Sequence, residues 1–117
     1  MRNFRDLRVY REGLGLNADL RKLAKSFPRE ERFALTEQLH RSADSIVLNI
    51  AEGAGNRSDR EFARFLEIAI RSGQEVMACL DIALASGLLP LNEHTSMCDR
   101  VDKVIAMMAR FQQTLRR

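Results

Sequence analysis

The sequence predicts an all-α fold, an antiparallel up-down-up-down four-helix bundle. Apolar residues recur at alternating steps of four and three along most of the chain, and no segment alternates as a half-buried strand would. The connections between these segments are short, so consecutive helices should run antiparallel. With 117 residues, 45% of them hydrophobic and 30% charged, the chain has room for one domain over residues 1–117.

The first helix is expected near residues 6–26 and has the weakest apolar pattern. Gly13 and Gly15 lie inside it, and each costs about 1 kcal/mol of helix stability relative to alanine. This helix should therefore depend on packing. Pro28 ends it and can open the next turn. The apolar positions are Leu7, Tyr10, Leu14, Leu16, Leu20, Leu23 and Phe27.

The second and third helices are expected near residues 30–53 and 59–86. Between them, residues 53–56 read Gly-Ala-Gly-Asn, a composition that tolerates left-handed backbone at a helix end. Ser58 and Glu61 then form a capping box, with each side chain bonded to the other residue's amide. The heptad seam of the third helix comprises Phe62, Leu66, Ala69, Gly73, Val76, Leu80 and Ala83.

The fourth helix is expected near residues 93–116, with Asn92 as its N-cap. Gly87 should end the third helix, and Leu88 and Leu89 should supply the apolar contact that accompanies such an ending. Val104 belongs to the apolar seam of the fourth helix, which repeats in steps of four and three.

The glycines before Ser58 do not match a phosphate-binding loop. They follow a helix, whereas a Walker or dinucleotide-binding loop follows a strand, and they lack the GxxxxGK or GxGxxG spacing. This stretch is therefore predicted to be a corner between two helices.

Polar residues share one face of the second helix, within an arc of about 80°. Three interpretations remain open: a hydrogen-bond network in the interior or at a subunit interface, an ordinary solvated face, and a small active site. No nucleophile–base pair is evident, so the sequence predicts no catalytic residue and no enzyme. The stripe comprises Gln38, Arg41, Ser45, Asn49 and Glu52.

Charged residues also recur on the third helix, at Arg64, Glu67, Arg71 and Glu75. Glu67–Arg71 and Arg71–Glu75 are i,i+4 pairs, which suggest a solvated ladder worth a few tenths of a kcal/mol per pair. Ion pairs between subunits are the alternative.

Positive charge is concentrated in the first and last quarters of the chain. The net charge is +3 overall, but residues 1–27 carry +4 and residues 90–117 carry +2. The first and fourth helices are neighbours in the predicted bundle, so these charges should share a side. That side is a candidate for nucleic-acid contact, a solvated face, or a surface that meets the acidic side of another copy in a ring. The nucleic-acid candidates are Arg5, Arg8, Arg11, Arg21, Lys22, Lys25 and Arg110.

No cofactor or metal site is predicted. His40 and His94 appear as isolated surface residues, and Cys79 and Cys98 form no CxxC pair. The two cysteines are expected to be reduced and to behave as small buried apolar residues, and whether they lie close together is left open. No apolar run reaches the length of a membrane span, and the N-terminus lacks a secretory signal, so a cytoplasmic location is expected.

The chain resembles the four-helix-bundle family of intervening-sequence proteins, first noticed in sequences that interrupt large-subunit ribosomal RNA genes of some bacteria. The resemblance is carried by FRDLRVYREG and by FPREERFALTEQLHRSADSIVLNIAEGAGNRSDREFARFLEIAIRSGQE, and above all by Asn49 to Gly53 followed by Ser58 and Phe62. The chain departs from the family pattern at Val47-Leu48, where proline is frequent, at Tyr10, where tryptophan is usual, and at Asp44, where an apolar residue is typical.

The resemblance implies a bacterial cytosolic bundle, commonly a homopentameric ring, with no established catalysis. A related group, the accessory proteins of diversity-generating retroelements, forms basic pentameric barrels that bind nucleic acid and a reverse transcriptase. We therefore expect a non-enzymatic homo-oligomer, a pentameric ring, with a nucleic-acid-associated or scaffold role and RNA or DNA as its partner. The alternative is a protein–protein interaction module that binds no nucleic acid; neither a small-molecule substrate nor a membrane is expected.

Overall fold

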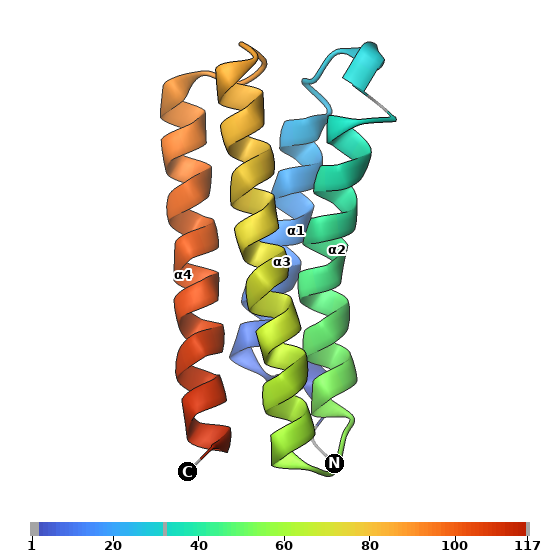
Figure 1. Ribbon diagram of the computed structural model, residues 1–117, viewed down its shortest axis with the longest axis vertical. Helices are drawn as coiled ribbons and strands as arrows, with labels where there is room; N and C mark the ends of the chain where they lie inside the picture. Colours follow the sequence, from blue (N-terminus) through green and yellow to red (C-terminus); the bar gives the residue numbers. More distant parts are fainter. Residues whose placement is uncertain (1–2, 32, 117) are drawn as a thin grey trace.

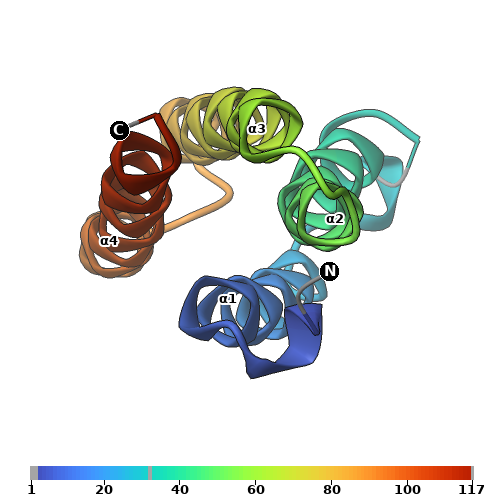
Figure 2. The same cartoon turned by 90° about the horizontal axis from the view of Figure 1, so that it is seen from below.

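The computed structural model describes residues 3–31 and 33–116, and within them it contains four long helices and no strand. The bundle measures 44 × 23 × 20 Å, and its helices lie along the long axis (Figure 1). Seen end-on, they follow one another around the bundle, with α1 and α4 as neighbours (Figure 2). The predicted fold class is thus confirmed. The elements are η1 Phe4–Asp6, α1 Arg8–Ala24, η2 Arg29–Glu31, α2 Leu35–Ala54, α3 Asp59–Ala85 and α4 Leu91–Leu115.

The predicted apolar seams form the core. Leu66 is fully buried and Val104 is 5% exposed, as the spacing requires. Leu14 is an exception, because it is 49% exposed although its position in the pattern predicted burial. Gly13 faces the core instead, where an added Cβ would lie 3.6 Å from Ile46, an ordinary contact distance.

The first helix is shorter than predicted at both ends. The chain begins with η1, where the Asn3 side chain accepts a hydrogen bond from the Arg5 amide at 3.1 Å. Leu7 then has extended backbone, which separates η1 from α1. At the other end, Phe27 precedes Pro28, and a residue before proline is disfavoured in helical geometry.

The second helix begins at Leu35, so the predicted start near residue 30 is wrong. Pro28 opens a separate 3₁₀ turn, closed by a bond of 3.0 Å from the Glu31 amide to the Pro28 carbonyl. Ala34 has backbone angles of φ −123° and ψ −99°, which no helix contains. The break at this residue prevents η2 from continuing into α2.

The corner between α2 and α3 is correct in place but not in backbone geometry. Gly55 has φ −74°, and among the described residues only Gly87 has positive φ, so the left-handed prediction is wrong. Glycine is needed here for close packing. A Cβ added at Gly53 would lie 2.7 Å from Phe62 Cδ1 and 2.8 Å from Phe65 Cβ.

Only half of the predicted capping box forms. Ser58 Oγ accepts a hydrogen bond from the Glu61 amide at 3.2 Å, which caps α3. The Ser58 amide, however, donates to Asn56 Oδ1 at 3.2 Å. The Glu61 carboxylate is drawn instead to the Arg64 guanidinium, 3.1 Å away.

The turn between α3 and α4 follows the predicted glycine ending. Gly87 has φ 76°, and the Leu88 amide donates to the Ala83 carbonyl at 2.8 Å, as in a Schellman motif. Leu89 is buried after it. Asn92 is not the N-cap of α4, because the helix already begins at Leu91, after the extended backbone of Pro90.

Candidate functional site

Three members of the polar stripe join a hydrogen-bond network between α2 and α3. Near the N-terminal end of α2, Gln38 Nε2 donates to the Glu75 carboxylate at 2.9 Å. Ser42 Oγ contacts the same carboxylate and also bonds to the Gln38 carbonyl at 2.9 Å. Because Ser42 is 1% exposed, these bonds compensate its hydroxyl for lost water.

The network continues along the same pair of helices. Ser45 Oγ lies 2.7 Å from Ser72 Oγ, across the helix contact. Asn49 Nδ2 donates to the Ser45 carbonyl at 2.8 Å and to its hydroxyl at 3.0 Å. These bonds link Gln38, Ser45 and Asn49 to one another or to α3 within one chain. Gln38 is exposed and the other two are half-buried, so the network lies at the edge of the α2–α3 contact.

Sequence reasoning missed Ser42 and Ser72 as members of this network. Ser42 lies one turn after Gln38, and this spacing is a signal that the sequence did contain. The partner of Ser72 lies on another helix, so no local pattern in the sequence indicated it.

The remaining charged candidates face solvent. Arg41 is 72% exposed and lies 3.5 Å from Glu37 on its own helix, and Glu52 is exposed as well. On α3, Arg71 pairs with Glu67 at 3.6 Å, as predicted. The other predicted rung, Arg71–Glu75, is not formed, because the Glu75 carboxylate turns toward α2.

The seven basic candidates do not form one surface. Arg11 is used locally, since its guanidinium donates to the Asp6 carbonyl at 2.7 Å and holds η1 against α1. The Arg5 guanidinium lies 4.6 Å above the Phe4 ring. Lys22 and Lys25 line a cavity of about 410 Å³ with His40, on the side where α1 meets α2.

Arg8 and Arg110 do lie together, in a groove between α1 and α4. Two adjoining cavities of about 300 and 200 Å³ share Arg8 and Met107 among their lining residues. We call this feature the α1–α4 groove. It is lined by Arg8, Val9, Glu12, Arg100, Lys103, Val104, Met107, Arg110, Phe111 and Thr114.

Four of the residues lining the α1–α4 groove are basic and one is acidic. Arg100 also pairs with Asp19 of α1, and Arg8 lies 4.0 Å from Glu12. Lys103 and Arg110 are exposed on α4. Arg100 and Lys103 were missed, although the three basic residues of α4 and Met107 follow helical steps of three, four and three.

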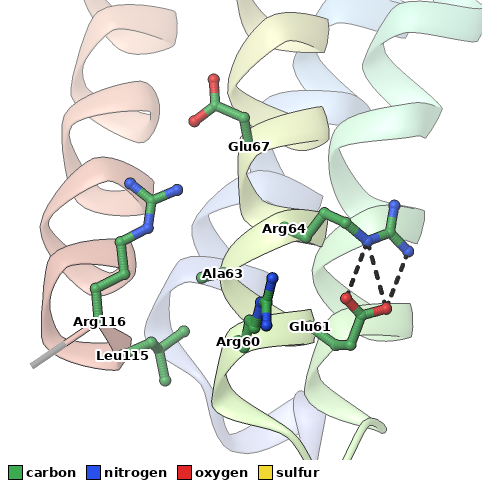
Figure 3. A pocket seen from close by; sticks show the side chains of 7 residues that line it. All are labelled: Arg60, Glu61, Ala63, Arg64, Glu67, Leu115 and Arg116. Carbon is green, nitrogen blue, oxygen red and sulfur yellow. Dashed lines mark hydrogen bonds and ion pairs between the residues drawn. The ribbon is translucent and has the colours of Figure 1, made fainter.

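Another cavity, of about 810 Å³, lies where α3 begins and α4 ends (Figure 3). Its charged groups include Arg60 and Arg116, from the two different helices. Its carboxylates are engaged: Glu61 binds Arg64, and Glu67 accepts a bond of 3.0 Å from the buried Gln112. The lining residues carry no hydroxyl, thiol or imidazole from which to build a nucleophile–base pair.

His94 is not the isolated surface residue that the sequence suggested. Its side chain is 16% exposed, and its Nε2 atom lies 2.8 Å from Asp81 Oδ1 and 3.5 Å from Cys98 Sγ. Burial raises the pKa of the Cys98 thiol, and the Asp81, Asp102 and Asp99 carboxylates raise it further.

Cys79 is buried and Cys98 is half-buried, and both are free thiols. Burial, and then the Glu75 carboxylate, raises the pKa of the Cys79 thiol. Both thiols are therefore protonated at neutral pH, and neither resembles an activated nucleophile.

Comparison with known proteins places this bundle in a family. The family model of the 23S rRNA-intervening sequence protein matches residues 5–110, from η1 to the last turns of α4. The chain belongs to the 23S rRNA-intervening sequence protein family. No curated protein matches it.

A solved structure supports the fold of this family member. It is a protein of unknown function of the S23 ribosomal protein family, from Bacteroides thetaiotaomicron. The two are 21% identical, with a TM-score of 0.82, and the match covers 89% of this chain and 97% of the other. At this identity the likeness bears on the fold alone. Among the described residues, no helix is both long and apolar enough to cross a bilayer.

Two of the three departures from the family pattern have partners in the structure. Asp44 is half-buried and accepts hydrogen bonds from Asn17 at 2.8 Å and Arg21 at 2.7 Å. Burial alone would raise the pKa of this carboxyl, but the bonds from Asn17 and Arg21, with the charge of Arg21, lower the pKa below its ordinary value. Tyr10 packs edge-on against Phe4, with 4.9 Å between the ring centroids.

Proposed function

We propose that this intervening-sequence protein is a non-enzymatic, nucleic-acid-associated scaffold that assembles into a homo-oligomer, and that the α1–α4 groove contacts the phosphate backbone. The observation that carries the proposal is the concentration of cations in this groove. Its lining includes four basic side chains and a single carboxylate, although the whole chain has nearly as many acidic as basic residues.

The length of the groove suits several phosphates. Arg100 and Arg110 lie ten residues apart on α4, which is about 15 Å along a helix axis. One strand of B-DNA advances about 3.4 Å per nucleotide, so the basic side chains span roughly four phosphates. Phe111 adds an aromatic ring to the lining, and aromatic rings are the surfaces on which unpaired bases stack. Because this ring also packs against the buried Phe62, with 5.2 Å between the ring centroids, the cations rather than the ring carry the proposed contact.

A salt titration tests this proposal. Fluorescence anisotropy would follow binding of a short labelled RNA, the matching DNA strand and the duplex, at increasing salt. The double variant Lys103→Gln/Arg110→Gln loses two groove cations. If both contact phosphate, the slope of log K against log salt should become less steep by about 1.4 for single strands and 1.8 for duplex DNA.

The matched control is Lys22→Gln/Lys25→Gln, which removes the same charge from the α1–α2 side. It should keep most of the wild-type slope. Equal losses in the two double variants would refute the groove as the binding surface. An absence of binding at low salt would refute a nucleic-acid role altogether.

A protein-interaction module without nucleic-acid binding is the second candidate. Leu48 and Leu14 are 66% and 49% exposed and line a shallow cavity of about 210 Å³ with Val47. Apolar side chains grouped in this way are typical of contact surfaces. The occupant we propose is a second copy of the chain, in the pentameric ring that the family resemblance implies.

Native mass spectrometry tests the assembly. The wild-type protein should give a pentamer, and Leu48→Gln should shift it toward smaller species. Ile82→Gln is the control, because Ile82 is 53% exposed but lies on α3 and outside that cavity. A monomeric wild-type protein would contradict the ring. An intact pentamer that does not bind nucleic acid would favour the protein-interaction module.

A further inference from the structure

Three chemically different side chains converge at the end of the bundle where α3 turns into α4, at the top of Figure 1. They are Asp81, His94 and Cys98, and their ligand atoms all lie within 4.8 Å of one another. Neither the α1–α4 groove nor the α2–α3 network includes them. From this geometry we infer that Asp81, His94 and Cys98 form a binding site for a zinc ion.

The local structure explains why these residues meet. His94 and Cys98 are four residues apart on α4, so both point from the same face of the helix. Asp81 comes from the last turns of α3. The Schellman turn at Gly87 brings α3 and α4 side by side and holds Asp81 level with the first turns of α4.

The distances suit a tetrahedral ion after small side-chain adjustments. Zinc binds imidazole nitrogen and carboxylate oxygen at about 2.0–2.2 Å and thiolate sulfur at about 2.3 Å. In a tetrahedron these bond lengths place neighbouring ligand atoms about 3.3–3.8 Å apart. His94 Nε2 lies 3.5 Å from Cys98 Sγ and 2.8 Å from Asp81 Oδ1, so the exposed carboxylate has to move away from the imidazole and toward the sulfur, which lies within 4.8 Å of it.

One proton on the His94 imidazole cannot bond well to both of its partners. Both contacts of His94 are made by Nε2, which has one in-plane direction for a proton or a lone pair. A proton there can point well at only one of the two partners. A metal ion in the same position binds all three, and on binding it displaces the proton of the Cys98 thiol to solvent.

The site is accessible and has room for a fourth ligand. Asp81 is 71% exposed, whereas His94 is largely covered and Cys98 is half-buried. Zinc sites with three protein ligands typically complete their tetrahedron with water. One open side toward solvent therefore provides both the entry path and the water position.

Cobalt(II) is the probe that tests the site, because cobalt–thiolate bonds absorb in the near ultraviolet and tetrahedral cobalt absorbs in the visible. The full-length protein would be stripped of metal, kept reduced with a phosphine, and titrated with cobalt. We expect saturation at one ion per chain with both absorption signatures, and displacement of cobalt by zinc. Zinc should also raise the midpoint of thermal unfolding, since it binds only the folded arrangement.

Variants assign the ligands. Cys98→Ser should abolish the sulfur band, and His94→Gln and Asp81→Asn should weaken cobalt binding by at least about tenfold, the lower bound for loss of a supporting group. The controls are Cys79→Ala, which removes the other thiol, and Asp102→Asn, which removes a nearby charge that is not a ligand. Both should bind cobalt as the wild type does.

Circular dichroism of each metal-free variant would establish that it is folded. A folded wild-type protein without a sulfur–cobalt band would overturn the zinc site. So would a sulfur band that survives in Cys98→Ser, or an equal loss of affinity in Asp81→Asn and Asp102→Asn.

Discussion

Replacing Gly53 by alanine tests the close packing at the corner between α2 and α3. The new methyl group would lie 2.7 Å from Phe62 Cδ1 and 2.8 Å from Phe65 Cβ. Phe62 is fully buried, and Phe65 Cβ is attached directly to the backbone of α3, so neither atom can swing aside. The two helices themselves must separate by several tenths of an ångström.

The expected cost follows from two opposing terms. Overpacking of a well-filled site costs typically about 1–3 kcal/mol. Alanine favours a helix over glycine by about 1 kcal/mol in the interior, and by less at Gly53, which lies one residue before the end of α2. We therefore expect Gly53→Ala to lower the free energy of unfolding by about 1–2 kcal/mol.

Urea denaturation followed by far-ultraviolet circular dichroism would measure this change, at one fixed protein concentration because assembly also contributes to stability. Two other glycines provide the comparison. A Cβ at Gly15 would meet only Arg100 Nη2 at 4.0 Å, so Gly15→Ala should stabilise by about 0.5–1 kcal/mol. A Cβ at Gly73 would lie 2.8 Å from Ile105 Cγ1, and χ1 of a β-branched residue in a helix is strongly restricted, so Gly73→Ala should cost about as much as Gly53→Ala.

The order of the three variants in free energy of unfolding tests this reasoning. If Gly53→Ala is as stable as the wild type while Gly15→Ala gains stability, the corner has more space than the contact distances indicate. The packing argument would then be refuted.

Three further predictions concern the cap, the core and the half-buried carboxylate. Ser58→Ala removes the α3 cap and should lower the free energy of unfolding by about 1 kcal/mol in urea; no change would mean that water replaces the hydroxyl without cost. Leu66→Ala should lower it by about 2–5 kcal/mol, because the side chain is fully buried, and a loss of under 1 kcal/mol would contradict that burial. Because the pKa of Asp44 is lowered in the folded state, its charge stabilises the protein above its ordinary pKa of 3.8, and this contribution disappears as the pH falls through the folded pKa. The stability difference between wild type and Asp44→Asn should therefore shrink below pH 3.8, and a constant difference would argue against the Asn17 and Arg21 bonds.

The number, order and inward faces of the helices could be predicted because they depend on neighbours within one or two turns. The spacing of Leu66 and its neighbours is a local property, and so are the Ser58 cap and the Gly87 ending. Local patterns failed where packing between helices, rather than the helix ending itself, requires a residue. Gly53 looked like a left-handed cap, yet it is required because two phenylalanines of α3 lie against it.

The candidate sites were predicted less well, since each one joins residues that are far apart in sequence. The partners of Glu75 come from α2, those of Arg8 in the groove come from α4, and Asp81 meets His94 across a turn. A sequence shows which face of a helix is polar, but not which polar group on the next helix stands at the same level.

By itself, then, the sequence determined four amphipathic helices and their order along the chain, because hydrophobic periodicity is a property of a few residues within one helix. Only the tertiary structure decided that Lys103 lines a groove with Arg8 and that Asp81 lies beside His94. The axial offset and spacing of packed helices are set by contacts over the whole core. A shift of one turn, about 5.4 Å, would separate every one of these pairs.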